Sequence, residues 1–401
     1  MTRRTFLLLA VPSIGCLLVG LVAVLVSRSA PVASPTLADG LRAIETRDAM
    51  AVERIASSLQ AAGSKDEARF LRASWLSSRG RFAQAVQLFT PSMFEGSLKP
   101  EALLLAGQLL FELKEFEQAE AVLKRLTTDF PDDVAAHRLL AVIYFDLRSH
   151  SLTMTELRHV QRLDPTDYRP HHLAGVILSD DERFQDAIEQ FQMALTKQPA
   201  LEVRTTIRHA LAQALMRNRD YRGAIAILTA EPVPSESEAL LAECQLSLGD
   251  ADAAGVIADR LLESHPDLIA AMKVKARLWE DAGEVTHAIE LMERVVVAEP
   301  FDVESRHRLA VLYGAAGQKE AHVSAQAEYL RVYNLHTRLV ELNVQADADS
   351  DAVAPRRELS EVCQALGRTE LAQVWQQAAD RCERRVQLNS SVTSQSHEEK
   401  N

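Results

Sequence analysis

The sequence is poor in the residues that build small disulfide-rich or zinc-bound folds. Only four cysteines occur among 401 residues, and no two of them have CxxC spacing. Neither a zinc site nor a disulfide framework is expected, although a Cys363–Cys382 bridge stays open for an oxidising compartment. Aromatic residues make up 5% of the chain, and glycine and proline are sparse. This composition suits a helical protein.

The motifs that bind nucleotides or carry out hydrolysis are also absent. The chain contains no GxxxxGK[ST], GxGxxG, GxSxG or HExxH sequence. The adjacent His171 and His172 would diverge on a helix, so they make a poor metal pair. We therefore predict no catalytic residue, no cofactor site and no metal site, and we expect that the protein is not an enzyme. A formal net charge of −12 argues against nucleic acid as a partner.

One long run without charge lies near the N-terminus. Phe6 to Val26 comprises 21 such residues, which is enough to cross a bilayer as a helix. We interpret residues 1–27 as a signal-anchor, with contact to the membrane through residues 6–26. The alternatives are a cleaved secretory signal, a lipoprotein signal that uses Cys16, and a twin-arginine export signal.

The charges that flank this run predict its orientation. Arg3 and Arg4 precede it, and only Arg28 follows closely. The positive-inside rule then predicts a single pass through the inner or plasma membrane, with the N-terminus in the cytoplasm. The rest of the chain would lie outside the cytoplasm, in the periplasm if the cell is bacterial.

A spacing of small and large apolar residues marks the stretch from Tyr168 to Leu201. Gly175 and Ala187 are small enough to let two antiparallel helices approach closely. Leu178 and Phe191 would fill the space between neighbouring helices. A proline near the end of the stretch, Pro199, cannot continue a helix and would end the second one.

The same spacing recurs through most of the chain, and it resembles the tetratricopeptide repeat (TPR), a helix-turn-helix unit of 34 residues. The repeats begin at Asp66, Pro100, Val134, Tyr168, Thr205, Ser235, Ile269 and Val303. One repeat cannot bury its own apolar faces, so repeats stack. The resemblance implies an all-α fold, a right-handed superhelical solenoid of about eight helix-turn-helix units, preceded by the transmembrane helix.

The parts outside the repeats have their own patterns. A three-to-four spacing between Gly317 and Gln345 predicts one long helix in place of a short second helix. The polar, serine-rich C-terminus is expected to be disordered. The predicted segments are an anchor (1–27), a linker (28–36), degenerate capping helices (37–65), a TPR array (66–335), a C-terminal helical cap (336–386) and a disordered tail (387–401).

A column of basic and imidazole residues is the candidate binding site. In the TPR family the first helix of each repeat lines a concave groove, partly through its position 5. In this chain position 5 is Leu104, Arg138, His172, His209, Ala239, Lys273 and His307 in successive repeats. The resemblance implies a peptide-binding groove in which Arg138, His172, His209, Lys273 and His307, named the basic column here, bind carboxylates. The alternative is a solvated helix face.

These patterns together predict a membrane-anchored TPR scaffold that mediates protein–protein interaction and complex assembly outside the cytoplasm. The expected partner is a protein or peptide whose identity the sequence does not reveal. The alternative is an accessory, non-catalytic subunit of an envelope biogenesis or secretion system, of the kind that matures cytochromes or exports polysaccharide.

Overall fold

The computed structural model describes residues 35–230, 234–349 and 352–398, with side chains of the last helix up to residue 384. Every regular element of these described residues is a helix. The chain divides into two compact units, Met1–Leu173 and Ala174–Asn401, and the boundary falls inside α11. The all-helical prediction is therefore confirmed for the part of the chain that the structure describes.

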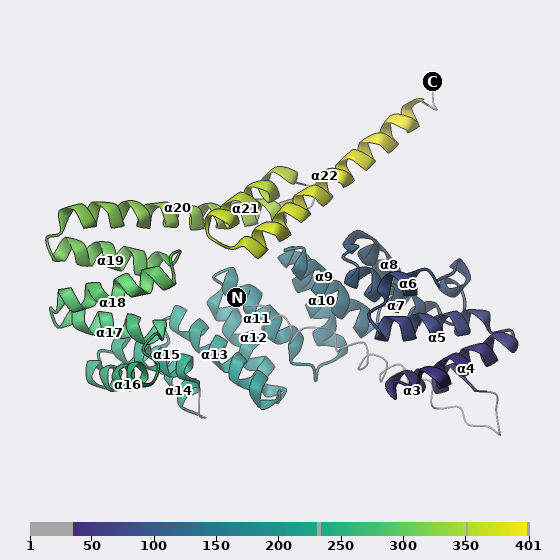
Figure 1. Cartoon of the computed structure of the whole chain (residues 1–401), viewed down its shortest axis with the longest axis horizontal. Helices are drawn as coiled ribbons and strands as arrows, with labels where there is room; N and C mark the ends of the chain where they lie inside the picture. Colours follow the sequence, from purple (N-terminus) through teal and green to yellow (C-terminus); the bar gives the residue numbers. More distant parts are fainter. Residues whose placement is uncertain (1–34, 231–233, 350–351, 399–401) are drawn as a thin grey trace. The chain divides into compact units, whose positions relative to one another are not determined.

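In the first unit, successive helices pair as antiparallel hairpins (Figure 1). The helix that begins the repeat at Val134 starts at the predicted residue. The elements are α3 Leu37–Glu45, α4 Ala49–Ala61, α5 Lys65–Ser78, α6 Phe82–Val86, the 3-10 helix η1 Pro91–Phe94, α7 Lys99–Glu112, α8 Phe116–Asp129, α9 Val134–Asp146, α10 His150–Leu163 and the start of α11 Arg169–Asp180.

The second unit continues the same hairpin pattern (Figure 1). Its elements after α11 are α12 Phe184–Thr196, α13 Leu201–Arg217, α14 Tyr221–Thr229, α15 Ser235–Ser247, α16 Ala251–Ser264, α17 Ile269–Asp281, α18 Val285–Ala298, α19 Val303–Ala315, α20 Lys319–Ala348, α21 Val353–Ala365 and α22 Thr369–Glu398. The helices that open three repeats begin at the predicted Ser235, Ile269 and Val303. α13 begins four residues before the predicted Thr205, so the slip in the repeat spacing is absorbed as an additional helical turn.

The predicted close approach of paired helices is confirmed at two glycines. A Cβ atom added to Gly107 would lie 2.6 Å from Leu123 Cδ2, and one added to Gly175 would lie 2.6 Å from Phe191 Cε1. Both separations are shorter than real carbon–carbon contacts. Any larger residue would therefore push apart the two helices of that repeat.

The turn inside each hairpin has a left-handed residue at position 15 of the repeat. Four repeats place glycine there: Gly80, Gly249, Gly283 and Gly317. The other four hold Lys114, Arg148, Glu182 and Arg219, each with φ between 59° and 65°. Glycine adopts this conformation without steric cost, whereas residues with a Cβ are strained in it.

The repeat at Asp66 departs from the prediction in its second helix. That helix, α6, ends at Val86, although the sequence pattern predicts Phe89 inside it. Thr90 precedes Pro91 and is extended, with φ −124° and ψ 152°, because proline disfavours the helical conformation of the residue before it. Phe89 stacks on Phe94 instead, with ring centroids 5.7 Å apart.

The C-terminal end differs from the prediction of a disordered tail at residues 387–401, because α22 continues as a helix to Glu398. Adding a residue to an existing helix costs far less than nucleating one. The packed first half of α22, which holds the buried Trp375, supplies that nucleus. The predicted long helix is confirmed as α20, and the expected boundary between array and cap, at residues 335 and 336, falls inside it.

The N-terminal predictions lie partly outside the described residues. Residues 1–34, which include the run from 6 to 26 and most of the linker at 28–36, are not described. Within the described ranges, no helix combines the length and apolar character that a bilayer crossing requires. α3 and α4 occupy the segment predicted as capping helices (37–65), and Leu41, Ile44, Ile55 and Leu59 are buried between them and α5.

Candidate functional site

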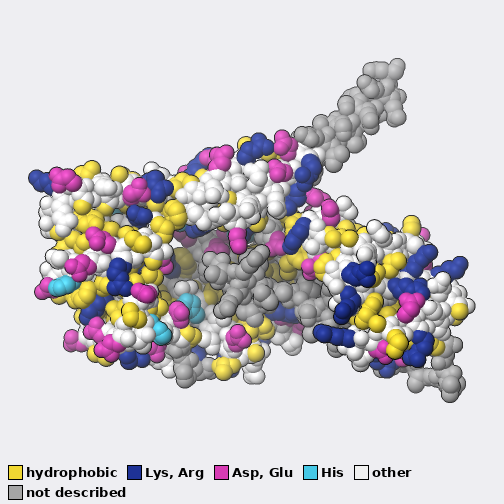
Figure 2. Space-filling model, viewed as in Figure 1, with side chains coloured by type: hydrophobic (Ala, Val, Ile, Leu, Met, Phe, Trp, Pro, Cys, Tyr) yellow, Lys and Arg dark blue, Asp and Glu magenta, His cyan; other side chains and the backbone are white. Residues whose placement is uncertain are grey.

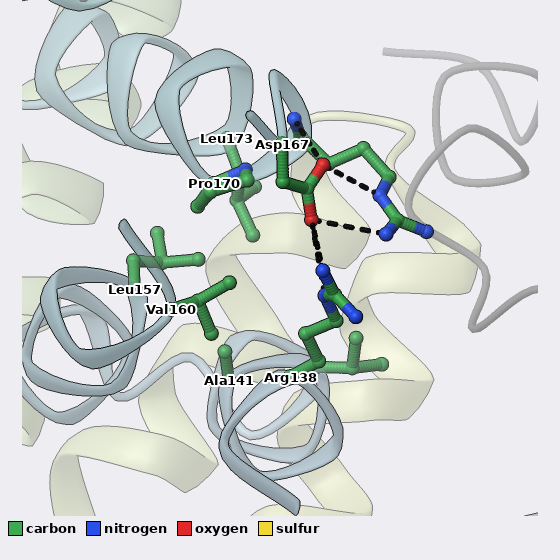
Figure 3. A pocket seen from close by; sticks show the side chains of 9 residues that line it. Arg138, Ala141, Leu157, Val160, Asp167, Pro170 and Leu173 are labelled. Carbon is green, nitrogen blue, oxygen red and sulfur yellow. Dashed lines mark hydrogen bonds and ion pairs between the residues drawn. The ribbon is translucent and has the colours of Figure 1, made fainter. Parts of the chain in front are cut away.

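An apolar hollow lies in the first unit between α9, α10 and the start of α11 (Figure 3). It encloses about 360 Å³, counting the part open to solvent. Its lining residues are Arg138, Ala141, Val142, Leu157, Val160, Asp167, Arg169, Pro170 and Leu173. The walls are apolar and the polar groups lie together at one edge, an arrangement typical of sites that bind a small apolar group in a set orientation.

The polar edge of the hollow is an ionic network centred on Asp167, whose side chain is only 4% exposed. Its carboxylate accepts hydrogen bonds from Arg169 N at 3.0 Å, Arg169 Nε at 2.8 Å and Arg138 Nε at 3.0 Å. Figure 3 shows the guanidinium group of Arg138 directed at this carboxylate. Bonds between ionised groups are about twice as strong as neutral ones, so Asp167 holds both arginines in place.

A second carboxylate completes the network. Asp164 Oδ2 accepts a hydrogen bond from Arg138 Nη2 at 2.5 Å, and Asp164 Oδ1 accepts one from Thr166 Oγ1 at 2.7 Å. Burial raises the pKa of Asp164, but the bonds from Thr166 and the charge of Arg138 outweigh this and hold that pKa below its usual value. Two cations face two anions, so the edge of the hollow carries no net charge.

The same arrangement recurs in the second unit. Lys273 Nζ donates to Glu299 Oε2 at 2.6 Å and to Asp302 Oδ2 at 3.0 Å. The sequence separations of 26 and 29 residues equal those of Arg138 from Asp164 and Asp167. We name this arrangement the turn clamp: a cation at position 5 is bound by carboxylates at positions 31 and 34 of its own repeat.

The three histidines of the basic column have different surroundings. His172 is 3% exposed, and burial lowers its pKa to about 4. His209 is half-buried, its Nδ1 lies 2.8 Å from Ser237 Oγ, and burial lowers its pKa as well. His307 is exposed, with its ring centroid 4.9 Å from that of Tyr329. Of these three histidines, His307 is therefore the one whose side chain is exposed to solvent.

The basic column thus does not present five exposed cations. Arg138 and Lys273 are bound in turn clamps, and His172 and His209 are predominantly neutral at pH 7 because their pKa values are lowered. The wider surface is similarly balanced: on the face drawn in Figure 2, Lys and Arg side chains lie among Asp and Glu side chains. A role for the column in binding remains a prediction.

The sequence reasoning missed the acidic half of the turn clamp and the hollow beside it. Asp167 and Arg169 were not singled out, although a signal for the clamp is present. The segments Asp164–Asp167 and Glu299–Asp302 both read acid-Pro-x-Asp, and each forms the end of a repeat with Arg or Lys at position 5. Within the described residues, no group of three or more His, Cys, Asp or Glu side chains is placed to hold a metal ion.

Comparison with known proteins gives two family matches, both to tetratricopeptide repeat models, over residues 76–143 and 209–269. No curated protein matches the chain. Solved structures with related folds include a MamA RS-1 double mutant, with 20% identity over 46% of this chain and 96% of that one, at a TM-score of 0.37.

Two further solved structures are similar over more of this chain. The C-terminal part of a TPR repeat-containing protein from Cytophaga hutchinsonii has 16% identity over 57% of this chain and 95% of that one, with a TM-score of 0.41. PilW, described as a type IV pilus biogenesis factor, has 15% identity, covers 58% and 93%, and has a TM-score of 0.34. At TM-scores below 0.5, none of these structures supports a functional inference. The family matches do fall on the helical hairpins described above, and residues 76–143 and 209–269 are thus the segments of this chain that are similar to tetratricopeptide repeats.

Proposed function

We propose that this chain is a non-catalytic scaffold that binds an extended segment of a partner protein at the hollow between α9, α10 and α11. The observation that carries the proposal is the apolar wall of the hollow with two fixed guanidinium groups at its edge. An aliphatic side chain of the partner would enter the hollow, and its burial there would be favoured by roughly 1.5–3 kcal/mol.

The arginines suit the main chain of such a segment. A guanidinium carries five N–H donors, and the bonds from Arg138 to Asp164 and Asp167 involve only its Nε and Nη2. The remaining donors can bond to carbonyl oxygens of a bound segment. Because the edge has no net charge, we expect it to bind neutral carbonyl groups more readily than carboxylates. The basic column enters this proposal through Arg138, which lines the hollow.

A chemical cross-linking pull-down of the full-length protein from native membranes tests the hollow. Val142→Trp fills the space, and Val297→Trp adds the same side chain at a position on α18 that is 81% exposed. We expect the first variant to lose a partner that the wild type and the second variant retain. Retention of every partner by the Val142→Trp variant contradicts the proposal.

The clamp supplies a second, matched comparison. Arg138→Ala and Lys273→Ala each break one turn clamp, but only Arg138 borders the hollow. Loss of the partner in the first variant alone identifies Arg138 as a contact. Equal loss in both variants shows that the clamps matter for stability and that the edge of the hollow does not bind.

We further propose that residues 6–26 anchor the scaffold to a membrane and that the repeats lie outside the cytoplasm. The support is the charge-free run and the excess of Arg3 and Arg4 over Arg28. Protease is added to cells whose outer membrane is permeabilised and whose inner membrane is intact. It should digest the repeats and spare a cytoplasmic control protein. Digestion only after the inner membrane is broken would place the repeats in the cytoplasm and refute the orientation.

A further inference from the structure

The long helix α20 exposes a concentration of apolar side chains. The described residues include 14 large hydrophobic side chains that are exposed, and five of them belong to this single helix. We name them the apolar stripe: Val323 (67% exposed), Leu330 (45%), Tyr333 (47%), Val340 (61%) and Val344 (66%). α20 lies along α19 and α21 (Figure 1). Its buried side chains, which include Val332, Leu339 and Leu342, belong to the opposite face of the helix.

The stripe has the spacing of a coiled-coil seam. Val323, Leu330 and Val344 fall on one heptad position and Tyr333 and Val340 on the other. The two remaining sites of the seam between residues 323 and 344 hold the polar Gln326 and Thr337. At about 100° per residue, the five side chains lie within roughly 100° of arc. The stripe is about 31 Å long, at 1.5 Å per residue. Such a regular seam is typical of a helix that pairs with another helix.

The charges beside the seam bear on which helix can pair with α20. In coiled coils, the flanking positions select the partner through ion pairs. Here those positions are Ala327, Tyr329, Asn334, His336, Glu341 and Asn343, and only Glu341 is formally charged at neutral pH. Glu341 is already paired with Arg338 at 2.9 Å within the helix. The seam therefore carries neither charges that select an unlike helix nor charges that repel an identical one.

We propose that the apolar stripe joins two copies of this chain into a two-fold dimer, in which the α20 helices form a short two-stranded coiled coil. Cyclic dimers are the commonest oligomers of soluble proteins. A neutral seam adds little like-charge repulsion when two chains of net charge −12 meet. One helix pair buries on the order of 1,000 Å², at the low end for specific interfaces, so the dimer should dissociate on dilution in the micromolar range.

Sedimentation of the full-length protein in a non-denaturing detergent tests this proposal. The seam variant is Leu330→Glu with Val340→Glu, and the control is Val256→Glu with Val297→Glu, at positions 70% and 81% exposed on α16 and α18. We expect the wild type and the control to reach the dimer mass at high concentration and the seam variant to dissociate at least about tenfold more readily.

Two outcomes overturn the proposal. A wild type that stays monomeric at all concentrations leaves the stripe to an unlike partner or a lipid surface. A seam variant that dimerises as the wild type does places the contact elsewhere, for example in residues 6–26. Either result leaves the hollow proposal untouched, because the hollow and the stripe have separate variants.

A cross-linking experiment covers the case in which the seam variant fails to fold. Tyr333 lies near the middle of the stripe, so it comes close to its own copy in a parallel pair and also in an antiparallel pair that is centred on the stripe. In a Cys16→Ser background, Tyr333→Cys should form a disulfide-linked dimer under mild oxidation, and Val297→Cys should not. Equal cross-linking at both positions, or none at Tyr333→Cys, contradicts the proposal.

Discussion

At the scale of single residues, position 15 of each repeat shows how strictly the hairpin turn constrains the backbone. Glycine occupies this left-handed position in half of the repeats, and charged residues occupy it in the other half. Glu182 has φ 59° and is exposed. Its strain is therefore not offset by burial, and replacement by glycine relieves it.

We accordingly predict that Glu182→Gly stabilises the protein by about 1 kcal/mol, because glycine adopts a left-handed conformation without the clash of a Cβ atom. Urea unfolding followed by circular dichroism measures the change. The matched control is Glu189→Gly, an exposed position inside α12, which should destabilise by about 1 kcal/mol. The same sign for both variants would contradict the role of position 15.

His172 makes stability depend on pH in the acid range. Burial lowers its pKa in the folded chain to about 4, from an ordinary value near 6.5. The unfolded chain therefore binds a proton at a higher pH than the folded chain does, and stability falls as the pH drops from 6.5 towards 4. By pH 5 the loss from this one group is about 2 kcal/mol.

Chemical denaturation at pH 7 and pH 5 checks this prediction. His172→Gln cannot take up the proton, so its stability should differ less between the two pH values than that of the wild type. His307→Gln, at an exposed position, should keep the wild-type difference. An undiminished difference in the His172→Gln protein would show that another group causes the acid sensitivity.

At the scale of elements, the turn clamp ties the first helix of a repeat to the turn that starts the next repeat. Lys273 on α17 bonds to Asp302, and Asp302 also accepts a hydrogen bond from Ser305 N at 3.1 Å as the N-cap of α19. Burial raises the pKa of Asp302, but the bonds from Ser305 and Lys273 hold it below its usual value. One carboxylate therefore serves two helices.

This double role predicts an order of stability losses. Asp302→Ala should cost about 2 kcal/mol, because it removes a helix cap and one clamp bond. Lys273→Ala should cost about 1 kcal/mol, since its side chain is 36% exposed and solvent screens its ion pairs. Urea unfolding of both variants, with the exposed Glu263→Ala on α16 as control, measures the order. A larger loss for Lys273→Ala would contradict the double role.

At the scale of the whole molecule, a stack of repeats needs a polar cover for its last apolar face. In the second unit this cover is made by α21 and α22. Val332, Leu339 and Leu342 of α20 are buried in a cluster with Leu359 of α21 and Trp375 of α22. α20 thus has two apolar faces. One is covered by α21 and α22, and the other is exposed to solvent.

A chain that ends at residue 349 should lose roughly 5 kcal/mol of stability, because three large side chains of α20 become exposed at about 1.5–3 kcal/mol each. A chain that ends at residue 386 keeps the cluster, whose last member is Ala378, and should unfold at the wild-type urea concentration. Coincident unfolding of the two truncated chains would show that α21 and α22 do not stabilise α20.

The agreement between sequence and structure is best where a local rule acts at a fixed spacing. The close packing of one hairpin, which repeats along the chain, accounts for two kinds of correct prediction. These are the close helix contacts at Gly107 and Gly175 and the repeat starts at Val134, Ser235, Ile269 and Val303. The shortened α6 was missed because Pro91 overrides the period. The helical continuation of α22 was missed because composition describes a polar segment but not the packed helix that precedes it.

The sequence by itself determined the helical hairpin, its period, its small-residue contacts and the apolar run near the N-terminus, because each depends on residues close together in the chain. Only the tertiary structure decided which members of the basic column are paired with carboxylates. Whether Arg138 and Lys273 face solvent or carboxylates depends on side chains 26 and 29 residues away. The hollow beside Arg138 and the exposed stripe of α20 also depend on which helix faces are covered by neighbouring helices. The spacing of residues along the sequence does not contain that information.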